Sequence, residues 1–257
     1  RARLSARRMT LFDAYDLIAL WERDRAGLPV TEKALLLLAL ARPDASHEAL
    51  VAMPFGACDR ALFELRAALF GDELRALSSC SACDEQLEVG VNIGELLAAV
   101  APAPAATHAS YTAGDLDLRF RLPTIEAAIA AARAAEPVAS RQSLVRRCIL
   151  AASRAGVTMA PDELDELDEE IIAGVAAAME RLDPLAEVRL KLVCTACDNA
   201  QSMLLEIASY LWAELMSEAE RLLDDVFGLA VQYGWREADI LAMSDAHTQV
   251  TDVDGLF

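Results

Sequence analysis

Two short cysteine motifs place the strongest constraint on how this chain can fold. Cys80-Ser-Ala-Cys83 and Cys194-Thr-Ala-Cys197 share the Cys-x-x-Cys spacing, and their first cysteines lie 114 residues apart. Each pair forms a turn that directs two thiolates toward one point, and two such turns complete the four-sulfur shell of a tetrahedral structural zinc site. We therefore expect one structural Zn²⁺ ion, with Cys80, Cys83, Cys194 and Cys197 as its ligands.

The likeness between the two motifs continues beyond the cysteines. Ile93 and Ile207 each follow the second cysteine of their pair by ten residues, and Leu97 and Leu211 each follow the isoleucine by four. The chain therefore carries one unit twice: a cysteine knuckle, a short extended run and the start of a helix. One shared zinc would tie the first half of the chain to the second, with an apparent binding free energy on the order of 10 kcal/mol or more.

Two other interpretations of the four thiols stay open at this stage: buried reduced cysteines, and a thiol–disulfide redox pair. Redox pairs usually lie at a helix N-terminus, whereas each pair here is followed by an acidic residue and a strand-like run. Knuckles often have glycine after the second cysteine, and Asp84 and Asp198 can adopt the same left-handed backbone. A catalytic zinc is disfavoured, because four thiolates leave no position for water.

Other residues that could carry chemistry give no support to catalysis. Cys58 and Cys148 stand alone on predicted helices, and we expect them to be buried, inert thiols. The acidic run 162–170 lacks the alternating oxygen ligands and the central glycine of an EF-hand loop. The sequence also lacks a phosphate-binding glycine loop and a nucleophile elbow. We therefore expect a protein that is not an enzyme.

The charge balance limits the partners of this chain. Its 257 residues include 23 basic and 41 acidic side chains, which gives a net charge of −18. Such a surface repels phosphate backbones and anionic lipid, so we expect neither nucleic acid nor a membrane as a partner. The longest apolar run, Ala34 to Ala41, is far shorter than a membrane span, and we expect no secretory signal, because no apolar core follows the N-terminal arginines. Together with Cys-x-x-Cys spacing that is typical of thiolate chemistry in a reducing compartment, this predicts a cytoplasmic protein.

Hydrophobic periodicity predicts a mostly α fold with a small antiparallel β zinc-ribbon patch, which is an α+β class. We expect one interwoven domain over residues 1–257, because a shared zinc would join its distant parts. Its predicted segments are N-terminal helices (10–75), the first knuckle with a strand and helix start (76–98), an Ala/Pro-rich linker (99–109), a strand with helices (110–185), the second knuckle (186–205), a long C-terminal helix with a short terminal helix (206–243) and a flexible tail (244–257).

Local patterns make more specific predictions. Alternating apolar residues predict strands over 87–91, 115–122 and 186–193, the second of them lying near the cysteine ribbon. Helical spacing predicts a helix over 143–155 and an acidic helix that begins at Pro161. Asn92, with Glu95 three residues further on, is expected to cap a helix.

The long C-terminal helix has an apolar stripe that steps by three and four residues from Leu211 to Tyr233. Most of this stripe is expected to face the core, although a groove for a partner is the alternative. Tyr210 and Trp212 lie beside the second knuckle in sequence, and we expect both rings to pack on the metal ribbon.

Several segments resemble a known family. They are the run from Gly56 to Gly71, the two knuckles, Phe120-Arg-Leu-Pro-Thr124, Ile207-Ala-Ser-Tyr-Leu-Trp-Ala-Glu214 and Tyr233-Gly-Trp-Arg-Glu-Ala-Asp-Ile-Leu241. In this order they resemble the T-even-type phage baseplate hub or hub-assembly proteins of contractile tails and phage-tail-like injection systems. The knuckles of that family usually read Cys-Pro-x-Cys-Gly, and both the proline and the glycine are replaced here, twice.

The resemblance implies a non-enzymatic, zinc-stabilised protein that builds or forms the central baseplate of a contractile tail. Its partners would be other baseplate or tail subunits. Two alternatives from other classes remain: a cytoplasmic zinc-ribbon adaptor unrelated to tails, and a thiol–disulfide redox protein. The acidic charge balance argues against a nucleic-acid-binding ribbon, which normally has a basic face.

Overall fold

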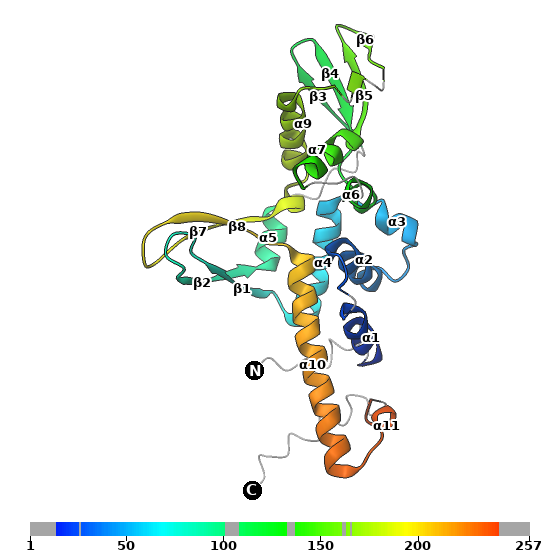
Figure 1. Ribbon diagram of the computed structural model, residues 1–257, viewed down its shortest axis with the longest axis vertical. Helices are drawn as coiled ribbons and strands as arrows, with labels where there is room; N and C mark the ends of the chain where they lie inside the picture. The colour runs from blue at the N-terminus through cyan, green and yellow to red at the C-terminus, as the bar shows by residue number, and fades with distance from the viewer. Residues whose placement is uncertain are drawn as a thin grey trace.

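The computed structural model describes residues 14–25, 27–100, 108–132, 137–160, 163–164 and 166–241. In this part of the chain helices dominate and three small antiparallel sheets accompany them, so the predicted α+β class is confirmed. Figure 1 shows an elongated molecule with a sheet-containing lobe at one end, a helical body in the middle and two hairpins that project sideways from the body. One long helix runs from the body to the opposite end.

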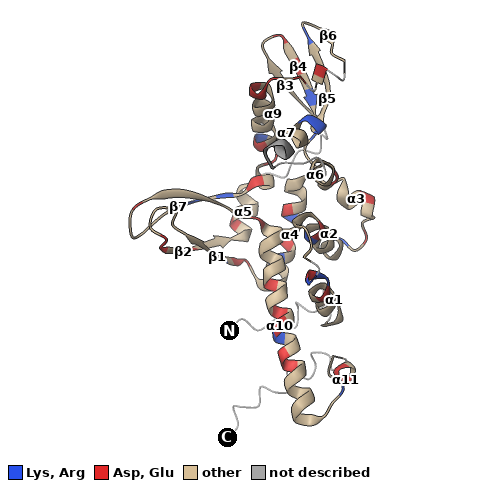
Figure 2. Ribbon diagram, in the orientation of Figure 1, with Lys and Arg blue, Asp and Glu red and all other residues tan. Residues whose placement is uncertain are grey.

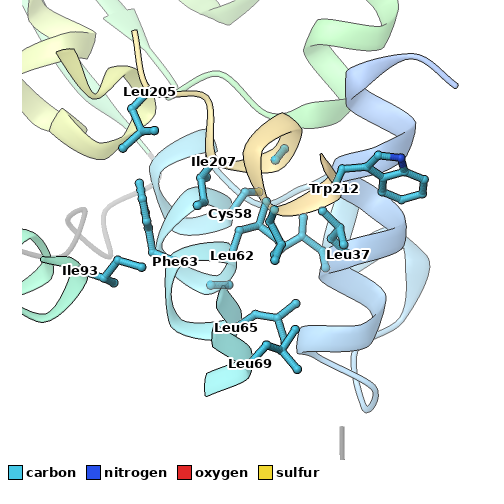
Figure 3. Close-up of a cluster of buried hydrophobic side chains, with 14 of the residues drawn as sticks. Leu37, Cys58, Leu62, Phe63, Leu65, Leu69, Ile93, Leu205, Ile207 and Trp212 are labelled. Carbon is cyan, nitrogen blue, oxygen red and sulfur yellow. The ribbon is translucent and has the colours of Figure 1, made fainter. Parts of the chain in front are cut away.

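The helical body contains the larger of the two main hydrophobic cores. Its elements are α1 (Ala14–Asp24), α2 (Val30–Ala41), α3 (His47–Val51), α4 (Phe55–Phe70), α5 (Ile93–Ala99) and the first half of α10 (Ile207–Tyr233). Leu37, Leu62, Phe63 and Ile93 are completely buried there, and the side chains gather around α4 (Figure 3). Each such burial stabilises the fold by about 1.5–3 kcal/mol relative to exposure.

A buried arginine joins the two longest helices of the body. The guanidinium of Arg66 on α4 is 4% exposed and donates two hydrogen bonds, of 3.0 and 2.8 Å, to the carboxylate of Glu214 on α10. It also donates to the carbonyl oxygens of Gly71 and Glu73, at 2.7 Å each, where the chain leaves α4. The positive φ of Gly71 (86°) turns the chain there, and Arg66 binds the carbonyl groups that this turn exposes.

The second core lies in the sheet-containing lobe. Its elements are β3 (Ala109–Ala113), β4 (Leu116–Phe120), α7 (Pro137–Cys148), β5 (Ile149–Arg154), β6 (Val157–Thr158) and α9 (Glu169–Leu182), and α6 (Ile125–Ala132) lies between the lobe and the body. The strands pair in the order β3-β4-β5-β6. Along β4 the side chains alternate, so that Leu116, Leu118 and Phe120 are buried against Val175 of α9 and the rest of that core.

A short joint connects the lobe to the body. After α9 the chain passes through Asp183 into the 3₁₀ turn η1 (Pro184–Glu187), which packs on α4. The carboxylate of Asp183 is 2% exposed and accepts a hydrogen bond of 2.9 Å from the backbone N–H of Gly56, in the first turn of α4. A negative group at this end complements the helix dipole and satisfies a free N–H group.

Most of the local sequence signals agree with the structure. The strand predicted over 87–91 is β2 (Gln86–Asn92), and the one predicted over 186–193 is β7 (Arg189–Val193). Asn92 caps α5 as expected, with its Oδ1 accepting from the N–H of Glu95 at 2.9 Å. Residues 101–107 of the predicted linker and the whole tail over 244–257 lie outside the described residues. The prediction of one interwoven domain is not tested and stays a prediction.

Four local predictions are wrong. The helix expected over 143–155 ends at Cys148, and Ile149 begins strand β5, which pairs with β4. The acidic helix expected to run on from Pro161 is not continuous, because residues 163–164 are helical, residues 167–168 are not, and α9 begins at Glu169. The strand over 115–122 exists as β4, but it lies in the lobe and not beside the cysteine ribbon. Residues 73–79 form strand β1, although no strand was expected before the first knuckle.

The close contact at the joint predicts that Gly56→Ala destabilises the protein. A Cβ atom at this position would lie 1.7 Å from Oδ1 of Asp183, so the carboxylate would have to move away from the α4 N-terminus. We expect a loss of about 1–3 kcal/mol in the free energy of unfolding, measured by urea denaturation. As a control, Gly228→Ala on α10 meets no atom within 4 Å and should stabilise by roughly 0.5–1 kcal/mol. An unchanged urea midpoint for Gly56→Ala would rule out this contact.

The joint also predicts a pH dependence of stability. Burial, reinforced by the nearby carboxylates of Asp183 and Glu206, raises the pKa of Asp59 to about 8. The folded chain therefore binds a proton more tightly than the unfolded chain, and this group's contribution to stability falls as pH rises from about 4 to about 8. The side chain introduced by Asp59→Asn is uncharged at every pH, so the free energy of unfolding of this variant should fall less between pH 5 and pH 8, as measured by urea titrations. The control Asp44→Asn, at an exposed site, should leave the fall in stability unchanged. A fall in Asp59→Asn as steep as in the unaltered protein would contradict the prediction.

Candidate metal centre

Two hairpins hold the cysteine motifs, one in each half of the chain. The first pairs β1 (Glu73–Ser79) with β2, from Glu73↔Asn92 to Ser79↔Gln86. The second pairs β7 with β8 (Ala200–Leu204). The hairpins lie side by side and project from the body with the knuckles at their far ends, beyond the last strand pairs (Figure 1). Leu87 and Leu192 are buried between them and form a third, small core with Cys80 and Cys194.

The two knuckles have the same backbone geometry. In the first, the N–H of Cys80 donates to the carbonyl of Glu85 at 2.8 Å, and its own carbonyl accepts from Asp84 at 2.9 Å. The second knuckle repeats both bonds at Cys194, at 2.9 Å each. Asp84 and Asp198 both adopt a left-handed backbone, with φ of 58° and 56°. The expectation that aspartate replaces the usual glycine at this turn is thus confirmed.

The sulfur atoms of the four cysteines lie close together. The Sγ atoms of Cys80, Cys83, Cys194 and Cys197 all lie within 4.8 Å of one another. Across the two knuckles, Cys80 and Cys197 are 3.6 Å apart, and Cys83 and Cys194 are 3.7 Å apart. A tetrahedral zinc site with Zn–S bonds of about 2.3 Å requires sulfur–sulfur distances of about 3.8 Å. The cluster therefore has the size that a tetrahedral metal ion needs, and these separations are far longer than a disulfide bond of about 2.05 Å.

A backbone N–H group points at the buried first cysteine of each knuckle. The N–H of Ala82 points at Sγ of Cys80 at 3.4 Å, and the N–H of Ala196 points at Sγ of Cys194 at the same distance. The hydrogen bond from Ala82 is the main cause that lowers the pKa of the Cys80 thiol to about 6. At Cys83 the N–H of Glu85 lowers the pKa, but the other three sulfurs and burial outweigh it and raise the pKa to about 12. One thiol of the cluster can therefore lose its proton readily, but further thiolates so close together repel one another unless a cation balances their charge.

Polar side chains of the second hairpin lock it onto the first. The amide of Gln201 accepts from the N–H of Ser81 at 2.8 Å and donates to the carbonyl of Ser79 at 2.9 Å. Asn199 donates to the hydroxyl of Ser81 at 3.1 Å and lies 3.8 Å from Sγ of Cys80. These two residues were not found from the sequence, because a Gln and an Asn beside a knuckle carry no pattern that reveals a long-range contact.

The other sequence candidates lie away from the cluster. Cys58 and Cys148 are buried as expected, and burial raises the pKa of their thiols to about 12 and about 11. Tyr210 meets the ribbon, because its hydroxyl donates to the carbonyl of Arg75 on β1 at 2.6 Å. Trp212 does not: its indole N–H donates to Asp24 of α1 at 2.7 Å, and its ring packs in the helical body. The prediction that both rings pack on the ribbon is therefore wrong for Trp212.

The fold and the cluster define the class of this chain: an α+β protein whose two halves meet at four cysteines able to hold a metal ion. None of its described helices is long and apolar enough to cross a bilayer. The sequence profile of the T4 bacteriophage base plate protein family matches residues 30–212, which is most of the chain. The protein therefore belongs to this family of phage baseplate proteins, as the motif resemblance predicted. No curated protein and no solved structure matched the chain.

Proposed function

We propose that this protein is a non-enzymatic, zinc-stapled component of the baseplate of a contractile tail, acting in the hub or in hub assembly. The family match over residues 30–212 is the observation that carries this proposal. Membership of a baseplate family implies contacts with other baseplate or tail subunits. Assembly would take place in the cytoplasm of the producing cell, as the free thiols of all six cysteines favour.

Zinc is the metal that the donor set favours. Four thiolates in a tetrahedral arrangement suit Zn²⁺, whereas Mg²⁺ and Ca²⁺ require oxygen ligands. A shell of four protein ligands leaves no open coordination position, so the ion would supply stability and no catalysis. Its position explains its role: it would clamp the outer ends of two hairpins that reach the cluster from distant parts of the chain (Figure 1).

A redox role fits the same residues less well. In a thiol–disulfide enzyme one cysteine of a Cys-x-x-Cys pair attacks a substrate disulfide, and the second cysteine of the same pair then displaces the substrate thiol to form a disulfide with the first. Here the 3.6 and 3.7 Å sulfur contacts run across the two knuckles, and the knuckles precede strands instead of helices. This arrangement favours shared coordination of one ion.

We expect Cys80→Ser and Cys194→Ser each to lose bound zinc and to destabilise the helical body as well as the hairpins. The reason is that Leu74 and Val188, at the bases of the two hairpins, belong to the main core. Zinc per chain can be measured by elemental mass spectrometry, with about one expected in the unaltered protein. Hydrogen exchange in α4 then reports on the body.

The control for this experiment is Cys148→Ala, because Cys148 lies in the core of the other lobe. Its zinc content should equal that of the unaltered protein. Full zinc content in Cys194→Ser would exclude the shared site. A loss of protection confined to the two hairpins would exclude a clamp that supports the body.

Deletion of the gene in the producing strain tests the baseplate role. We expect electron microscopy to show few or no complete contractile tails, because central baseplate assembly would fail, and a plasmid copy should restore them. Mass spectrometry of purified particles then separates the two roles, since a hub subunit remains in the particle and an assembly factor does not. Normal numbers of complete tails in the deletion strain would contradict the proposed baseplate role.

A further inference from the structure

The C-terminal end of α10 exposes a group of large apolar side chains. Phe227 is 71% exposed, Val231 70%, Tyr233 55% and Trp235 43%, all within the last turns of the helix and the turn that follows. Figure 1 shows that this end of α10 extends beyond the helical body, and that among the described elements the short helix α11 (Glu237–Leu241) lies beside it. We call these four residues the α10 tip.

The side of this helix segment that lies away from Phe227 and Val231 is already used. Val226 of α10 is 6% exposed and Ile240 of α11 is 7% exposed, and α11 packs against α10. Phe227 and Val231 are four residues apart and therefore share one face of the helix, away from that packing. Exposed apolar groups of this kind mark protein–protein contact sites.

The aromatic part of the α10 tip is held in a fixed arrangement. The rings of Tyr233 and Trp235 are stacked, with 5.1 Å between centroids and 27° between planes. Gly234 between them adopts a left-handed backbone, and its N–H donates to the carbonyl of Ala230 at 2.9 Å. Rings that are already ordered lose little entropy on binding, which favours a surface that docks a partner.

Charge around the α10 tip indicates what kind of partner fits. Residues 216–241 contain six carboxylate side chains and only two arginines. Asp224, Asp225, Glu237 and Asp239 are exposed, and acidic residues follow one another along the projecting half of α10 in Figure 2. Of the two arginines, Arg221 is paired with Glu218. A complementary surface therefore presents apolar side chains with Lys or Arg beside them.

We propose that the α10 tip docks a segment of another tail subunit that presents apolar side chains flanked by Lys and Arg. The identity of that partner as a tail subunit rests on the proposed baseplate function, whereas its chemistry rests on the tip itself. A second copy of this chain fits poorly, because it would bring one acidic rim against another. The surface is independent of the metal cluster, which lies at the far ends of the two hairpins (Figure 1).

A photo-crosslinking side chain at position 227 of the full-length protein, in cells that produce the tail, tests this inference. We expect crosslinks to a segment of another tail subunit that has apolar residues with adjacent Lys or Arg, identified by mass spectrometry. The double substitution Asp224→Lys, Asp225→Lys should lower the yield about tenfold, because it places like charges opposite each other. Leu77 on β1 is equally exposed, at 71%, and is the matched control position. The same segment should not be captured from position 77.

The possible outcomes separate this inference from the proposed function. A crosslink to a segment of the expected chemistry in a protein unrelated to tails would support the docking surface and overturn the baseplate role. Crosslinks only to a second copy, or only to residues 1–13 of the same chain, would overturn the inference. A captured segment without basic residues, a yield insensitive to the charge reversal, or no crosslink from position 227 would overturn it as well.

Discussion

The meeting of four cysteines from two distant hairpins is the constraint on which the rest of this structure depends. The knuckles lie at the outer ends of β1–β2 and β7–β8, and the inner ends of the same hairpins contribute Leu74 and Val188 to the main core. The sheet-containing lobe is the segment between the hairpins, so it leaves the body after the first hairpin and returns just before the second. Closing so long a segment costs chain entropy, and each doubling of loop length adds about 0.6 kcal/mol. A zinc ion bound as proposed, with an apparent binding free energy on the order of 10 kcal/mol, would offset that cost.

The buried ion pair between Arg66 and Glu214 joins the same two halves without a metal. A buried charge is costly unless every donor finds a partner, and here the guanidinium is held by two carboxylate contacts and two carbonyl groups. Two of those contacts are to Gly71 and Glu73, at the start of the first hairpin, and the others are to α10, which follows the second. One side chain thus ties the base of the first hairpin to α10, the helix that follows the second hairpin, while the cysteines bring the outer ends of the two hairpins together. This explains how a pair of two-stranded hairpins, each marginal alone, can project from the body.

The features that the sequence predicted correctly are those encoded locally. Spacing alone identified the knuckles, the cap at Asn92 and the strands β2 and β7, because each needs only a few neighbouring residues. The boundary at Cys148 could not be predicted in this way, because the whole run 143–155 has helical spacing and its second part, Ile149–Arg154, becomes a strand only by pairing with β4. Strand β1 was hidden because Leu77 faces solvent and breaks the alternation that Leu74 and Ala76 begin. Gln201 and Asn199, which lock the two knuckles together, became visible only once the hairpins were placed side by side.

The repeated unit explains why one helix of this protein projects so far. Each copy runs from a hairpin into a helix that begins with a completely buried isoleucine, Ile93 in α5 and Ile207 in α10. These two residues enter the same core, so the first turns of both helices serve the same purpose. Helix α5 stops after seven residues, whereas α10 continues for 27 and passes beyond the core. The stripe that begins at Leu211 is core as far as Val226, but Tyr233 at its end is exposed, so the prediction of an inward face fails where the body ends. The second copy thus has a length of helix that the fold does not use, and that length carries the apolar side chains of the α10 tip.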